Sequence, residues 1–318
     1  MNPRKPPAGG LNTVPEPDGP MIIDVHVHCA PTSRWLSYDP VNDRYYRWIT
    51  ASQLIARMKK EGIDRAVVLP IQSPETAIEP ITSQEAIAMS KRHRGKLIPF
   101  CNPDPRLYMG VKKALSLILE EYKQAGCKGV GEVTANIHFD DPKALTLFGL
   151  CEQLELPLLF HIGPQIGGCY GLVDDMGLPR LEKVLRTYPD LKFIGHSQPF
   201  WSEISGDLKP EDRNSYPKGK VVPGGRAVEL LRDYPNLYAD LSAGSGYNAI
   251  SRDREFGIRF LDEFQDKLLF GTDLDYMGQE LPQVGYLQGL YKGGRISRKV
   301  HDKIMYRNAL RVLRLSST

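Results

Sequence analysis

The chain has 318 residues, of which 41% are hydrophobic and 25% charged, with a formal net charge of +3. This length suits one α/β barrel of about 250 residues with insertions, and the composition supplies a sizeable core and an ordinary water-facing surface. The small net charge disfavours a nucleic-acid-binding protein or one attracted to an acidic membrane, and no apolar stretch approaches the ~18 residues of a membrane span.

The cysteines and the first residues bear on compartment and domain organisation. The five cysteines are scattered and form no Cys-x-x-Cys pair: Cys29, Cys101, Cys127, Cys151 and Cys169. This pattern argues against a disulfide framework and fits a reducing, cytoplasmic compartment. Residues 1–20 are rich in proline and glycine and have no apolar segment of the signal-peptide kind. We expect a flexible tail at 1–20 and a single domain at 21–318.

From residue 21 onward, apolar strand patterns alternate with amphipathic helix patterns. In the first half we expect strands at 21–28, 63–69, 96–101 and 128–134, and helices at 52–61, 82–93, 111–125 and 141–154. In the second half we expect strands at 156–161, 191–196, 237–241 and 267–273, and helices at 178–188, 225–234, 254–264 and 297–313. Each of the eight expected strands is thus followed by a helix.

The strands are continuous apolar runs, which is typical of a parallel sheet covered on both faces. Eight βα units in one domain predict a closed (β/α)8 TIM barrel of the α/β class. A doubly wound open sheet is the alternative, but the glycine-rich phosphate loop that usually accompanies it is absent.

Three connections are longer than the topology requires: 31–50, 197–224 and 274–295. They follow the carboxyl ends of expected strands, the face where barrel enzymes keep their active sites. We interpret them as insertions that are either solvated or form a lid or substrate wall.

The first expected strand ends in two histidines spaced by one residue, His26 and His28. Residues i and i+2 of a strand point to the same face, so the two imidazoles project side by side, as two ligands of one cation must. A lone His-x-His pair can arise by chance, and the interpretation therefore depends on residues further along the chain.

Four more ionisable residues fall at or near the ends of later strands: Glu132, His161, His196 and Asp273. Because the carboxyl ends of barrel strands meet at one mouth, all six side chains should converge there. Each has an ordinary structural explanation on its own, as a core histidine, a paired carboxylate or a helix cap. Together they predict a metal site, because buried ionisable groups are costly unless they are paired or bound to metal.

The residue types indicate which metal fits. Imidazole and carboxylate ligands without thiolate suit zinc, with manganese, iron or cobalt as alternatives. Cys29 adjoins His28 but lies on the opposite face of the strand, so we expect it to pack rather than to bind metal.

Several segments resemble the amidohydrolase superfamily, specifically the amidohydrolase-related (amidohydrolase 2) branch that also contains nonoxidative decarboxylases of the aminocarboxymuconate-semialdehyde and resorcylate type. The resemblance spans about residues 21–315 and is carried by IIDVHVH, KGVGEVTANIHFDDP, PLLFHIG, LKFIGHSQPFW, LLFGTDLD and KIMYRNALRVLRL. The ordered set of His-x-His, His, His and Asp is specific for the superfamily and much less specific for the reaction.

The resemblance implies that the main metal is bound by His26, His28, His161 and Asp273. His196 would bind a second ion or donate a hydrogen bond to the substrate. Glu132 departs from the decarboxylase pattern and is similar to a glutamate of binuclear, TatD-like hydrolases. Two ions bridged by Glu132, and one ion with Glu132 hydrogen-bonded nearby or paired with a basic residue, both remain open.

The leading hypothesis is a metal-dependent hydrolase that uses metal-activated water on a small carbonyl, amide or lactone substrate bearing a carboxylate. Asp273 would move the proton from the water to the leaving group, and His196 would help to stabilise the oxyanion. Arg34 and Arg106 are candidates for orienting the substrate carboxylate. Further candidates for the pocket wall are Gln165, Trp201 and Tyr276.

Two rival functions remain. One is a metal-dependent nonoxidative decarboxylase, in which Asp273 would protonate the carbon that loses carbon dioxide. The other is a non-catalytic barrel that binds metal or ligand. A TatD-like DNA nuclease is disfavoured because the sequence lacks a basic surface interleaved with aromatics. We therefore expect a small-molecule substrate and no nucleic-acid or membrane partner, and homo-oligomerisation remains open.

Overall fold

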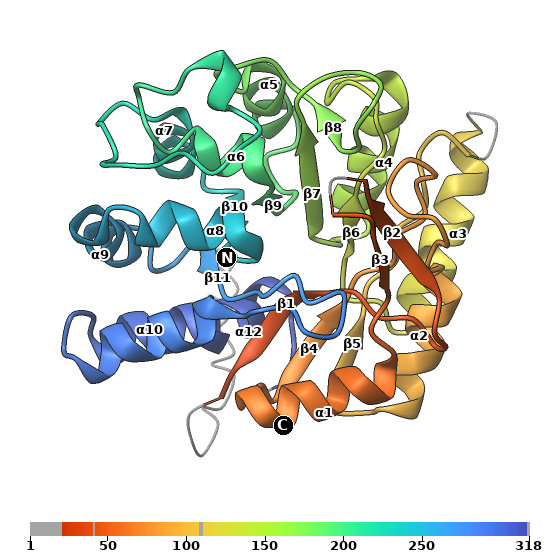
Figure 1. Ribbon diagram of the computed structural model, residues 1–318. Helices are drawn as coiled ribbons and strands as arrows, with labels where there is room; N and C mark the ends of the chain where they lie inside the picture. Colours follow the sequence, from red (N-terminus) through yellow and green to blue (C-terminus); the bar gives the residue numbers. More distant parts are fainter. Residues whose placement is uncertain (1–20, 41, 108–110, 317–318) are drawn as a thin grey trace, which may run out of the picture.

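The computed structural model describes residues 21–40, 42–107 and 111–316 (Figure 1). Within these residues, eight parallel strands build a barrel: β1 (Ile23–Val27), β4 (Arg65–Val68), β5 (Leu97–Pro99), β6 (Val130–Val133), β7 (Leu158–Gly163), β9 (Phe193–His196), β10 (Leu237–Asp240) and β11 (Leu268–Leu269). The predicted (β/α)8 TIM barrel is confirmed. The predicted tail at 1–20 lies outside the described residues.

Two hydrogen-bonded ladders make up the barrel wall, β1-β4-β5 and β11-β10-β9-β7-β6. Parallel bridges between Val27 and Leu274 and between Cys101 and Val130 join the two ladders, so that the ring of strands closes (Figure 1). Closure gathers the carboxyl ends of all the strands at one mouth.

Helices on the outside of the ring cover the strands: α1 (Ala51–Glu61), α2 (Ser83–Arg92), α3 (Lys112–Gln124), α4 (Pro142–Gln153), α5 (Pro179–Thr187), α7 (Arg226–Asp233) and α9 (Arg254–Glu263). The helix predicted at 297–313 consists of α11 (Arg298–Asp302), a π-helical turn (Lys303–Arg307) and α12 (Asn308–Val312). Local signals explain several helix starts, since Thr50 and Thr82 form capping boxes and Asp141 caps α4.

The long connections contain secondary structure that the sequence did not predict. Residues 31–50 form the hairpin β2 (Trp35–Asp39) and β3 (Arg44–Arg47), and later connections contain β8 (Leu172–Val173), α6 (Gln198–Ser202), a 3-10 turn (Pro210–Asp212), α8 (Ala243–Ser251) and α10 (Pro282–Lys292). Two glycines each in α8 and α10 lower the intrinsic helix propensity, whereas buried side chains such as Ile250 and Leu287 favour the helix through packing.

The core is apolar, and its cysteines are thiols. All five cysteines belong to the described part of the chain and are free. Cys29 is buried with its Sγ 3.9 Å from Sδ of Met89, consistent with the predicted packing role. None of the helices in the described ranges is both long and apolar enough to cross a membrane.

Gly195 allows the ring of Phe200 to pack directly against the backbone of β9. An added Cβ would lie 2.6 Å from Cζ of the Phe200 ring, which is fully buried and cannot move away. We predict that Gly195→Ala lowers the free energy of unfolding by about 1–3 kcal/mol through overpacking. Chemical denaturation would measure this.

Gly149→Ala is the matched control, because Gly149 lies inside α4 and its added Cβ would meet Tyr188 at an ordinary 3.5 Å. It should raise stability by about 0.5–1 kcal/mol through helix propensity. Equal effects of the two substitutions would contradict the packing argument.

Candidate metal centre

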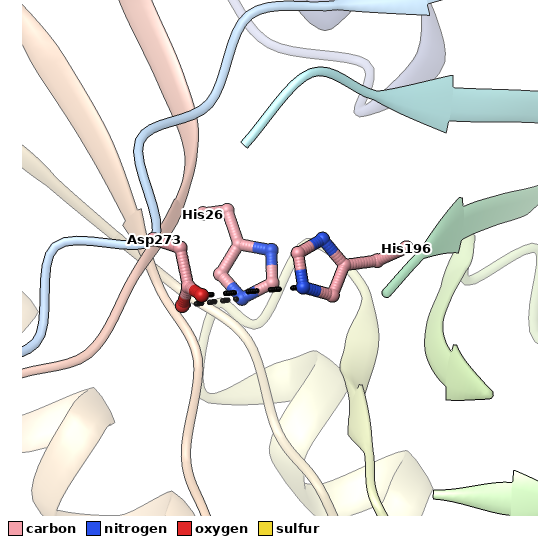
Figure 2. Close-up of side chains that lie close together, drawn as sticks. All are labelled: His26, His196 and Asp273. Carbon is pink, nitrogen blue, oxygen red and sulfur yellow. Dashed lines mark ion pairs between the residues drawn. The ribbon is translucent and has the colours of Figure 1, made fainter. Parts of the chain in front are cut away.

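The barrel mouth gathers the six ionisable residues singled out by the sequence. Three groups of three have ligand atoms within 4.8 Å of one another, namely His26, His196 and Asp273; His26, His28 and Glu132; and Glu132, His161 and His196. Figure 2 shows one of these groups, with Asp273 facing the near nitrogens of His26 and His196. The predicted convergence of the six side chains is therefore observed.

His26 lies within β1 and His28 directly after it, and their rings project from the same side of the strand. Their Nε2 atoms are 3.1 Å apart. Asp273 Oδ1 lies 3.3 Å from each of these nitrogens, and Glu132 Oε2 lies 3.6 Å from His26 and 3.5 Å from His28. Two imidazoles and two carboxylates thus face one point.

Asp273 reaches this point from an unusual backbone conformation. Its φ is +59°, in the left-handed region that aspartate tolerates better than most residues. Its N–H donates to the carbonyl oxygen of His26 at 2.8 Å, which ties the segment after β11 to β1. The carboxylate is thereby aimed back across the mouth.

Glu132 faces a second set of ligand atoms with its other oxygen. Glu132 Oε1 lies 2.8 Å from His161 Nδ1 and 3.8 Å from His196 Nε2. Asp273 Oδ2 lies 4.0 Å from the same His196 nitrogen. Glu132 therefore stands between two halves of the centre, one formed with His26 and His28 and the other with His161 and His196.

The nitrogens that point away from the centre have acceptors. His28 Nδ1 donates to the carbonyl oxygen of Leu69 at 2.8 Å, and His26 Nδ1 donates to Asp240 Oδ2 at 2.9 Å. With each ring donating through Nδ1, the two Nε2 lone pairs face each other at 3.1 Å. Such facing lone pairs, ringed by carboxylates, fit a divalent cation, and the donor set suits zinc or a similar metal.

Asp240 and Ser242 belong to the centre, and the sequence interpretation missed them. Asp240 is fully buried at the end of β10, and Ser242 Oγ lies 2.9 Å from His196 Nδ1. The signal was present, because Asp240 is the next-to-last residue of the strand expected at 237–241 and the last residue of β10.

Asp24 was also missed, although it precedes His26 by two residues and so shares its strand face. Asp24 accepts hydrogen bonds from the N–H of His26 and from both the N–H and the hydroxyl of Thr272. Burial raises the pKa of Asp24 to about 7, against the lowering effect of these hydrogen bonds. The carboxyl group thus fastens β1 to the residue before Asp273.

The carboxylates control the charge of His26 and His28 when no cation is bound. Burial opposes protonation of His28, but hydrogen bonds to Asp273 and Glu132 outweigh it and raise the pKa of His28 to about 9. Burial likewise opposes protonation of His26, yet Asp240, Asp273 and Glu132 together raise its pKa well above the ordinary value. Protons and metal therefore compete for the same lone pairs.

A cavity of about 430 Å³ opens beside the centre. Its lining includes His161, whose ring centroid lies 4.6 Å from that of Tyr170, together with Glu75, Pro164, Gly168, Cys169, Gln198 and Asn214. Gln165, a predicted wall residue, adjoins this lining but is exposed, and its amide donates to the carbonyl oxygen of Gly167 at 3.2 Å. The cavity is a space next to the centre that is large enough for a small molecule.

The two arginines proposed to orient a substrate are engaged by acidic residues of the protein. Arg34 pairs with Glu85 and donates to the carbonyl oxygen of Pro80. Arg106 forms a two-pronged pair with Glu75 at 2.8 and 2.9 Å and also contacts Asp104. Neither guanidinium is free to receive a substrate carboxylate without breaking these pairs.

Two aromatic candidates take different positions. Trp201 is almost fully buried in the core, where its Nε1 donates to the carbonyl oxygen of Asp240 at 3.0 Å. We therefore reassign Trp201 from the pocket wall to support of Asp240. Tyr276 packs against Tyr46 of the hairpin with ring centroids 4.7 Å apart, and it lines a separate cavity of about 330 Å³ with Trp48.

Comparison with known proteins places the chain in a family. A family model described as Amidohydrolase matches residues 23–315. The chain therefore belongs to the amidohydrolase family, as its resemblance implied. No curated protein matches it.

Solved structures share the fold at low sequence identity. An uncharacterised TIM-barrel protein from Bordetella bronchiseptica has a TM-score of 0.64 and 16% identity, covering 94% of this chain and 100% of the other. A probable 2-pyrone-4,6-dicarboxylic acid hydrolase from Acinetobacter baumannii, with citric acid bound, has a TM-score of 0.56 and 13% identity, covering 92% and 99%. A 5-carboxyvanillate decarboxylase from Novosphingobium aromaticivorans, complexed with manganese, has a TM-score of 0.54 and 16% identity, covering 83% and 80%.

The pKa of His28 leads to a prediction about pH. A pKa raised from 6.5 to about 9 stabilises the metal-free fold fully below pH 6.5, and this stabilisation is lost as the pH rises toward 9. We predict that the melting temperature of chelator-treated protein falls across this window, while zinc-loaded protein keeps its stability because zinc affinity rises as protons leave. Thermal melts from pH 6 to 9 would measure both. Parallel pH profiles with and without zinc would contradict the competition between protons and metal. His28→Gln should reduce the pH dependence of the metal-free protein and leave the part that comes from His26.

Proposed function

We propose that this amidohydrolase-family protein is a metal-dependent hydrolase of a small lactone or amide. The observation that carries the proposal is the position of Glu132, whose two carboxylate oxygens face two different pairs of histidines. Asp273 also reaches both halves, with one oxygen near His26 and the other near His196. In this proposal Glu132 would be a ligand common to two divalent ions, and zinc suits the donor set best.

When bound, the metal supplies a Lewis acid that lowers the pKa of water and polarises a substrate oxygen. His26, His28 and Glu132 would hold one ion. His161 and His196, again with Glu132, would hold the other. Asp273 is the base in this proposal, because its side chain is 26% exposed at the mouth while the histidines beside it are buried. It would take the proton of the attacking water and return it to the leaving group.

The cavity beside His161 indicates what kind of substrate would fit. Its polar lining offers the amides of Gln198 and Asn214 and the Tyr170 hydroxyl as hydrogen-bonding groups. Glu75 also lines it, but its carboxylate is paired with Arg106. We therefore propose a small polar substrate whose recognition does not depend on a salt bridge with Arg34 or Arg106.

Decarboxylation is the second candidate. Asp273 is placed as well to protonate a carbon as to accept a proton from water, and a 5-carboxyvanillate decarboxylase shares the fold. The two reactions differ in what they release. Lactone hydrolysis releases an acid, whereas decarboxylation of an aromatic acid releases carbon dioxide.

The test is a substrate panel assayed with zinc-loaded and manganese-loaded protein. Small lactones and amides would be followed by acid or amine release, and hydroxylated aromatic acids by carbon dioxide release. We expect turnover of a lactone or amide with no carbon dioxide from the acids. Release of carbon dioxide alone would replace hydrolysis with decarboxylation, and binding without turnover of either class would support a non-catalytic barrel.

Asp273→Asn tests the proton transfer. The amide keeps an oxygen toward His26 and His28 but cannot accept a proton, so we predict that kcat falls by about 10²–10⁴-fold while much of the metal is retained. Steady-state kinetics and metal analysis on the same sample would separate the two effects. Near-normal kcat with normal metal content would remove Asp273 as the base.

Glu132→Gln tests the shared carboxylate. We predict near two ions per chain in the wild type, falling toward one in the variant, as measured by inductively coupled plasma mass spectrometry. Glu203→Gln is the matched control, because Glu203 is equally buried but pairs with Arg213 away from the centre. One ion in both wild type and Glu132→Gln would exclude bridging and favour decarboxylation.

A further inference from the structure

One buried carboxylate contacts imidazoles from two strands that are not neighbours in the barrel. Asp240 Oδ2 lies 2.9 Å from His26 Nδ1, and Asp240 Oδ1 lies 3.1 Å from His196 Nδ1. His26 belongs to β1 and His196 to β9, and the side chain of Asp240 is completely buried. In Figure 2 the two rings lie side by side, with one nitrogen of each toward Asp273 and the other directed away from it.

The two oxygens of Asp240 are not equivalent. Oδ1 also accepts from the backbone N–H of Ser242 at 3.0 Å and from the Ser242 hydroxyl at 2.5 Å. Trp201 holds the backbone of Asp240 through its indole N–H. The Oδ1 position is thus surrounded by donors, whereas Oδ2 faces the ring nitrogen of His26.

We propose that Asp240 is a positioning residue that holds His26 and His196 in the Nδ1–H tautomer together, and thereby directs both Nε2 atoms to the metal. The inference rests on the proposed metal-dependent function. A carboxylate has only acceptors, so both rings must donate to it through Nδ1. Each ring then has its Nε2 lone pair free on the side of the metal. One residue therefore serves both halves of the centre.

The substitution Asp240→Asn distinguishes the tautomer of His26 from that of His196. Its amide has one acceptor oxygen and one donor nitrogen, and it cannot accept from two ring N–H groups on opposite sides. The oxygen must stay at the Oδ1 position, because the N–H of Ser242 donates there. The amide nitrogen would then face His26 Nδ1 and donate to it, because the Ser242 hydroxyl, the other group near this nitrogen at 3.2 Å, lies closer to His196 Nδ1 at 2.9 Å. His26 would switch to the Nε2–H tautomer and would no longer have a lone pair for the metal.

His28 and His196 are internal controls for the tautomer of His26. His28 donates through Nδ1 to the carbonyl oxygen of Leu69, which no side-chain substitution removes. His196 still finds the asparagine oxygen and the Ser242 hydroxyl at its Nδ1. Asp240→Asn should therefore change the tautomer of His26 and leave the tautomers of His28 and His196 unchanged.

The experiment is long-range ¹H–¹⁵N NMR of histidine-labelled, zinc-loaded protein, which reads the tautomer of each ring directly. We expect Nδ1–H for His26, His28 and His196 in the wild type. In Asp240→Asn we expect His26 alone to change, with a fall of about 10–100-fold in zinc affinity. Asp174→Asn is the matched control, because Asp174 is as buried but accepts from the backbone N–H groups of Arg180 and Leu181; it should leave all three tautomers and zinc affinity unchanged.

Two results would overturn the proposal. The first is an Nε2–H tautomer at His26 or His196 in the zinc-loaded wild type, which needs no variant to fold. The second is an Asp240→Asn protein with unchanged tautomers and unchanged zinc affinity. Because neither readout requires turnover, a protein that binds zinc with these tautomers but hydrolyses no substrate would refute the proposed function alone.

Discussion

The electrostatic balance at the barrel mouth is the constraint on which the rest of the site depends. His26 is fully buried, with Asp240 on one side of its ring and Asp273 and Glu132 on the other. Carboxylates at such depth are unfavourable unless cations or hydrogen-bond donors compensate them. Without metal, protons on His26 and His28 provide this compensation, which is why the pKa values of these two imidazoles are raised. A divalent ion would compensate the same carboxylates without protonating the rings.

The barrel supplies the geometry for this balance. Parallel strands end at one mouth, so residues as far apart in the chain as His26 and Asp273 can share one cation. The N–H of Asp273 donates to the carbonyl oxygen of His26, and Asp24 binds both the N–H of His26 and Thr272. These hydrogen bonds make the junction between β1 and the segment after β11 part of the site. Asp240 links β9 to the site in the same way, because its carboxylate accepts a hydrogen bond from His196 Nδ1.

Much of this could be predicted from the sequence, because strand periodicity and strand ends are local signals. His26 and His28 share a face by the two-residue repeat, and His161, His196 and Asp273 end apolar runs. Asp240 also lies near the end of an apolar strand, but it contacts the nitrogens of His26 and His196 that point away from the mouth. The sequence pattern does not show such a supporting position. Arg34 and Arg106 were assigned to substrate because their partners, Glu85 and Glu75, come from segments 51 and 31 residues away. Long-range pairing of that kind has no local pattern.

The most direct test of the account is a crystal structure of zinc-loaded protein with diffraction data collected at the zinc absorption edge. We predict an anomalous peak about 2.0–2.1 Å from Nε2 of both His26 and His28, with Asp273 and Glu132 around it. A zinc-loaded protein whose anomalous signal lies elsewhere, with His26 and His28 bridged only by solvent or a proton, would contradict the assignment of this mouth as the metal centre.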